Sequence, residues 1–68
     1  MTLDCRGMLC PLPVIKLAQA FPDIAIGDTI TVLADDPAAA TDIPAWCRLR
    51  SQELVSAIDD QYVVRRLS

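Results

Sequence analysis

The sequence predicts an α+β fold, a two-layer α/β sandwich in which a four-stranded mixed sheet carries two helices on one face. Apolar residues change period along the chain, from the alternation of a strand to the spacing of a helix and back, in the order βαβαββ. Turn-forming residues mark each change, and no repeat, linker or low-complexity tract interrupts the pattern. The 68 residues are expected to form one domain, residues 1–68, around a small core.

The first strand is expected at Thr2–Cys5, where apolar and polar residues alternate. A helix should follow the connection through residues 6–9. Proline favours the first helical position, which predicts Pro11 at N1 and Cys10 at the N-cap. Pro22 limits the length of this helix. Its apolar residues at helical spacing are Val14, Leu17, Ala18 and Phe21.

The second strand is expected at Thr29–Ala34, between turn-forming residues on both sides. The second helix should run from about Thr41, a good N-cap, to about Arg50. Pro44 would then fall in the first turn, where proline is tolerated. One face of this helix collects Ile43, Trp46 and Cys47.

Two further strands are expected at Glu53–Ile58 and Gln61–Leu67, joined by a tight turn at Asp59-Asp60. A strand, a crossover helix and a second strand of one sheet run parallel with a right-handed connection. The carboxyl ends of the first two strands therefore lie at the same end of the sheet. This places Cys10 beside Asp35-Asp36.

Cys10 is the candidate functional residue. A thiol is a weak hydrogen-bond acceptor and makes a poor helix cap, so a cysteine at this position indicates a chemical role. A helix N-terminus favours the thiolate and can lower the pKa of Cys10, by less than about one pKa unit. A small buried residue is the alternative interpretation. Pro11 and Pro13 favour the chemical role because they stiffen the segment that holds the sulfur.

Asp35 and Asp36 have two interpretations. Both are common in turns that end a strand and enter a helix. They could also form a negative rim beside the thiol, where they would raise the pKa of Cys10 and attract a basic partner, whereas Arg6 would lower that pKa. The sequence leaves this balance open.

The other two cysteines are expected in the core. Cys5 faces inward on the first strand, with a resolving thiol for Cys10 as the alternative, and Cys47 lies beside Trp46 on the packed helix face. The three cysteines match no zinc pattern, so neither a metal site nor a cofactor site is predicted. An odd number of cysteines without a signal peptide favours the cytoplasm.

Composition excludes several function classes. Histidine is absent, which excludes Ser-His-Asp and Cys-His catalysis. The net charge of −3 and the scattered cations disfavour direct nucleic-acid binding. No apolar run approaches the ~20 residues that span a bilayer, so membrane insertion is not expected.

Several motifs occur together along the whole chain. They are the CPxP signature Cys10-Pro11-Leu12-Pro13 with Val14, and Leu3-Asp4, Gly7, Gly27-Asp28, Ala34-Asp35-Asp36-Pro37-Ala38, Asp42-Ile43-Pro44, Cys47 and Glu53-Leu54. In this combination the chain resembles the TusA/SirA family of sulfur carriers. The resemblance implies a fold similar to the C-terminal domain of a bacterial translation initiation factor.

The resemblance also implies a function. Cys10 would accept sulfane sulfur as a persulfide from a cysteine desulfurase or rhodanese-type donor and relay it to a downstream acceptor. Family members supply tRNA 2-thiolation, molybdenum-cofactor assembly or sulfur oxidation in this way. The chain would be a monomeric carrier with sulfurtransferase-like chemistry rather than a turnover enzyme.

Two alternatives remain from the sequence. One is an accessory module of thiosulfate uptake or selenium metabolism. The other is a non-catalytic regulatory or RNA-contacting domain, which rests on fold analogy alone.

Overall fold

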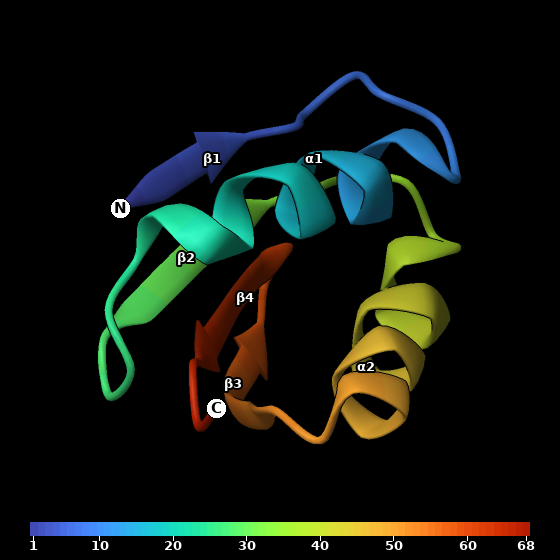
Figure 1. The fold of residues 1–68 in the computed structure, drawn as a ribbon. Helices are drawn as coiled ribbons and strands as arrows, with labels where there is room; N and C mark the ends of the chain where they lie inside the picture. The colour runs from blue at the N-terminus through green and yellow to red at the C-terminus, as the bar shows by residue number, and fades with distance from the viewer.

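The computed structural model describes residues 1–68 and has the predicted βαβαββ order (Figure 1). Its strands are β1 (Thr2–Asp4), β2 (Thr29–Leu33), β3 (Glu53–Ile58) and β4 (Gln61–Arg65). Its helices are α1 (Leu12–Ala20), the short 3-10 helix η1 (Phe21–Asp23) and α2 (Ala39–Arg50). The sheet order is β1-β2-β4-β3, with β1 parallel to β2 and the other pairs antiparallel. The mixed four-stranded sheet is confirmed.

The two central strands supply the sheet side of the core. In β2, Ile30 and Val32 are fully buried and alternate with half-buried neighbours, as expected for a strand that packs on one face. Ile30 lies opposite Val64 of β4, and Val32 lies opposite Tyr62. Both helices pack on this face, and they contribute Leu17, Ile43, Trp46 and Cys47 to the same buried cluster. The two-layer arrangement follows from this single core.

β3 and β4 form a hairpin. Asp59 and Asp60 both have positive φ, 49° and 62°, which is the backbone of a two-residue type I′ turn that aspartate tolerates. The register of the hairpin shifts between Leu54 and Ser56, where a β-bulge interrupts the ladder.

α1 begins one residue later than predicted. The N–H of Leu12 donates to the carbonyl of Leu9 over 2.9 Å, which closes a turn around Cys10 and Pro11 before the helix starts. Pro11 therefore occupies the N-cap, and Pro13 takes the second helical position. The prediction of Cys10 as N-cap is wrong, because Cys10 lies inside this turn.

α2 begins two residues earlier than predicted. The carbonyl of Asp36 accepts the N–H of Ala39 over 2.9 Å, and its side-chain Oδ1 accepts the N–H of Ala38 over 3.2 Å. These bonds start the helix ahead of Thr41, so Thr41 is not the N-cap. Pro44 consequently lies in the helix interior, where it leaves one carbonyl without its helical N–H donor.

The other predicted bounds agree with the structure to within two residues. β1 ends at Asp4, but the N–H of Cys5 still donates to the carbonyl of Leu33 over 2.7 Å. β2 ends at Leu33 and β4 at Arg65. No helix in residues 1–68 combines the length and the apolar character needed to cross a bilayer.

Candidate functional site

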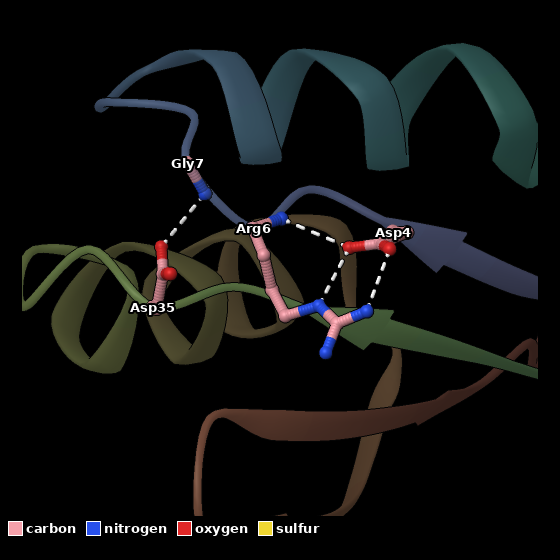
Figure 2. Close-up of polar contacts among 4 residues, drawn as sticks. All are labelled: Asp4, Arg6, Gly7 and Asp35. Carbon is pink, nitrogen blue, oxygen red and sulfur yellow. Dashed lines mark hydrogen bonds and ion pairs between the residues drawn. The ribbon is translucent and has the colours of Figure 1, made fainter.

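The loop between β1 and α1 is held by an ion pair at its start (Figure 2). Arg6 donates two side-chain hydrogen bonds to the carboxylate of Asp4, from Nε to Oδ1 over 2.9 Å and from Nη2 to Oδ2 over 2.8 Å. The hydrogen bonds from Arg6 lower the pKa of Asp4 to about 2. Arg6 is thereby paired with Asp4. It does not lower the pKa of Cys10, which was the effect that the sequence suggested for it.

Gly7 turns the same loop toward the end of β2. Its φ of +82° lies in the left-handed region, which glycine adopts without steric cost. Its N–H donates to Oδ1 of Asp35 over 2.9 Å, as Figure 2 shows. This bond ties the loop that carries Cys10 to the residues that follow β2.

Asp36 makes the second tie. Its Oδ2 accepts the backbone N–H of Cys10 over 2.6 Å, while its Oδ1 accepts the N–H of Ala38 at the start of α2. One carboxylate thus fixes the main chain of Cys10 against the N-terminus of α2. The structure confirms that Cys10, Asp35 and Asp36 share one end of the sheet.

The thiol of Cys10 is exposed and donates a short hydrogen bond to Oδ2 of Asp42. Asp42 lies in the first turn of α2. This bond raises the pKa of Cys10 because it stabilises the S–H form, and partial desolvation and the negative charges of Asp42 and Asp36 raise it further. The balance that the sequence leaves open therefore lies on the side of a raised pKa, because the carboxylates of Asp42 and Asp36 outweigh the N-terminus of α1, which begins two residues after Cys10.

Cys10 stands at one end of a groove between the two helices, with a volume of about 380 Å³. Leu49 of α2 forms part of this groove and is 81% exposed. The remaining lining residues are Pro11, Val14, Asp42, Ala45 and Trp46. Apart from Cys10 and Asp42 the walls are apolar, so the thiol opens onto a surface suited to apolar side chains.

The other cysteines lie away from solvent. Cys5 and Cys47 are buried, as predicted, and burial raises the pKa of both thiols. All three cysteines are free, so the structure contains no Cys5–Cys10 disulfide. No group of three or more potential metal-ligating side chains is placed to hold an ion. Cys10 is therefore the thiol that a partner can reach.

Asp42 is the site residue that sequence reasoning did not assign. The available signal was its position: a helix that starts at the carboxyl end of β2 has its first turn at the end of the sheet where Cys10 lies. An acidic residue in that turn is therefore a candidate neighbour of the thiol.

Comparison with known proteins gives consistent matches. The family model described as "Sulfurtransferase TusA" matches residues 1–66. A protein of Archaeoglobus fulgidus, described as a "putative sulfur carrier protein", is 45% identical over 53 residues, which are 78% of this chain and 69% of the relative. The crystal structure of a SirA-like protein from Desulfitobacterium hafniense has the same fold, with a TM-score of 0.70 at 24% identity over 93% of this chain and 89% of the other.

Proposed function

The chain belongs to the TusA family of sulfur carriers, and from this premise we propose that Cys10 carries sulfane sulfur as a persulfide from a donor protein to an acceptor protein. The observation that carries the proposal is the exposed Cys10 thiol at the mouth of an apolar groove. Residues 1–68 act as one carrier domain.

The transfer step is a thiol–persulfide exchange. The Cys10 sulfur attacks the outer sulfur of a cysteine persulfide on the donor, and a new S–S bond forms on Cys10. The bond between that outer sulfur and the donor cysteine breaks, and the donor cysteine leaves with the electron pair and takes up the proton released by Cys10. No electrons are gained or lost overall, because the sulfane sulfur only changes its cysteine.

The site residues divide the remaining tasks. Asp36 fixes the backbone of Cys10, and Asp42 accepts the hydrogen bond of the Cys10 thiol between transfers. Such an exchange requires an accessible sulfur and a docked partner, but neither an oxyanion hole nor a histidine base. A domain of this size without histidine can therefore perform it.

The donor class we propose is a cysteine desulfurase or a rhodanese-type protein. The acceptor would belong to tRNA 2-thiolation, molybdenum-cofactor assembly or sulfur oxidation, in the cytoplasm. The carrier leaves the donor with a persulfide on Cys10 and returns with a free thiol after transfer to the acceptor. It is therefore a regenerated carrier rather than a turnover enzyme.

Sulfur loading tests the proposal directly. The protein is incubated with a cysteine desulfurase and cysteine, or with a rhodanese and thiosulfate, and its intact mass is measured without reductant. We expect a gain of one sulfur atom that a thiol reductant reverses and that Cys10→Ser abolishes. Cys5→Ala and Cys47→Ala are controls that should still load. No gain with either donor, or a gain that survives Cys10→Ser, would reject the function.

A further inference from the structure

A second hollow of about 330 Å³ shares the lining residue Trp46 with the groove that begins at Cys10. It lies toward the C-terminal end of α2, where Pro22 of η1 and Arg66 also line it. Together the two adjacent hollows follow α2 from Asp42 to Arg50. Both helices begin near Cys10 and run away from it. On α2 the lining residues Asp42, Trp46 and Arg50 lie one turn apart, which makes the path roughly 12 Å long from Asp42 to Arg50.

The two ends of this groove carry opposite charges. At the first end Asp42 lines the groove and accepts the hydrogen bond of the thiol, and Asp36 lies next to it, bound to the backbone N–H of Cys10. Arg50 and Arg66 line the second end, with Arg50 placed 5.9 Å from the centre of the Trp46 ring. The ion pairs of the chain are Arg6–Asp4 and Arg65–Glu53, so Arg50 has no acidic partner.

Arg50 and Arg66 differ in what they can offer a ligand. Arg66 already donates to the backbone carbonyls of Pro22, Ile24 and Ser68. Arg50 makes no side-chain hydrogen bond within the chain, and its guanidinium is oriented by Trp46 alone. The available cation at the far end is therefore Arg50, with the exposed apolar side chain of Leu49 beside it.

We propose that this groove binds a peptide segment of the sulfur-transferring partner protein with a matching order of charges. The segment has a basic residue next to its reactive cysteine, facing Asp36 and Asp42, then apolar residues against Trp46 and Leu49, then an acidic residue that pairs with Arg50. An extended segment covers ~12 Å with about four residues, which sets the spacing between cysteine and acid. The inference rests on the proposed function, and it names the chemistry of the partner.

Disulfide exchange with synthetic peptides tests the charge order. Two hexapeptides begin with lysine and cysteine and continue with three apolar residues, but one ends in glutamate and the other in lysine. Each is supplied as its symmetric disulfide. Cys10 forms a mixed disulfide with one peptide strand and releases the other strand as a thiol, and intact mass gives the exchange equilibrium constant. The groove predicts about fivefold preference for the glutamate peptide, the effect of one exposed ion pair.

The variant Arg50→Glu should reverse the preference and favour the lysine peptide. Arg48→Glu is the matched control, because Arg48 is also an exposed cation in the last turn of α2 but does not line the groove. It should keep the wild-type preference. Circular dichroism of both variants verifies the fold. Equal binding of the two peptides by the wild type, or an unchanged preference in Arg50→Glu, would overturn the inference.

The outcome is separable from that of the sulfur-loading experiment. Peptide exchange requires only the Cys10 thiol. If the preference for the glutamate peptide is present but no sulfur is loaded, the proposed peptide-binding groove stands and the proposed carrier function is rejected. Sulfur loading without any peptide preference removes this inference alone.

Discussion

At the scale of single residues, the contact between Cys10 and Asp42 determines the state of the free protein. The carboxylate keeps the thiol protonated, and a protonated thiol is a poor nucleophile. A raised pKa lowers the thiolate fraction of the exposed sulfur, which disfavours its oxidation and alkylation in the absence of a partner. A partner that places a cation near Asp36 and Asp42 would weaken this restraint at the moment of transfer.

Asp42→Asn should make Cys10 more reactive. The substitution removes a negative charge and a strong acceptor that both favour the S–H form, so the pKa of Cys10 falls. The rate of alkylation by iodoacetamide, followed by intact mass across a pH series, should rise at a lower pH than in the wild type. Asp28→Asn, a change at an exposed residue outside the site, serves as control. An unchanged or higher midpoint in Asp42→Asn would contradict this account.

The sequence was sufficient to place three of the four site residues. Strand order and the position of the prolines brought Cys10, Asp35 and Asp36 together. The direction in which the pKa of Cys10 shifts could not be predicted from the sequence, because it depends on a hydrogen bond to Asp42, which lies 32 residues further along the chain. Propensities describe neighbours along the chain and do not fix such contacts.

At the scale of elements, the loop between β1 and α1 is the part that positions the sulfur. Side chains from outside the loop hold it through backbone N–H groups, Gly7 by Asp35 and Cys10 by Asp36. Its conformation requires the left-handed backbone at Gly7. The loop is therefore anchored to the end of β2 and the start of α2.

Gly7→Ala should destabilise the protein and disturb the site. A Cβ at this position has open space around it, so the cost is the left-handed backbone alone, about 1–2 kcal/mol. Urea unfolding measures the loss, and alkylation measures the change at Cys10. Gly27→Ala provides the comparison, since Gly27 has a similar φ of +93° and open space but lies outside the loop. It should lose similar stability with the Cys10 alkylation rate unchanged. Wild-type stability and reactivity in Gly7→Ala would refute the role of the loop.

The helix starts show where local rules were overridden. Local preference places Pro11 at N1 of α1, but the hydrogen bond from the N–H of Leu12 to the carbonyl of Leu9 places Pro11 in the turn before the helix. Thr41 is a sound local cap, but Asp36 starts α2 earlier while it also binds Cys10. The first contact encloses Cys10 in a turn, and the second uses the carboxylate that also binds the backbone of Cys10, so both shifted helix starts adjoin the site.

At the scale of the whole molecule, one small core supports every element. A chain of this length buries only about 60% of the surface that it exposes when unfolded, so each buried side chain matters. The overall architecture was predictable because periodicity and the handedness of the crossover connection leave few alternatives.

Ile43→Ala tests this dependence. Ile43 is fully buried next to Asp42, and the substitution leaves a cavity that costs about 2–5 kcal/mol. Small domains have total stabilities near the lower end of about 5–15 kcal/mol, so a large fraction of the variant should unfold at moderate temperature. Thermal unfolding by circular dichroism gives the midpoint. Ile26→Ala, at an exposed position, should change the stability by less than about 0.5 kcal/mol. Equal midpoints for the two variants would contradict the single-core description.

The β-bulge in β3 has a consequence for solubility. β1 and β3 are the outermost strands of the sheet, and unpaired backbone groups on such strands invite self-association and fibril growth. β1 has only three residues, and the bulge breaks the regular spacing of β3. Neither border offers a long regular template, which disfavours association through strand edges in a chain of which 53% of the residues are hydrophobic.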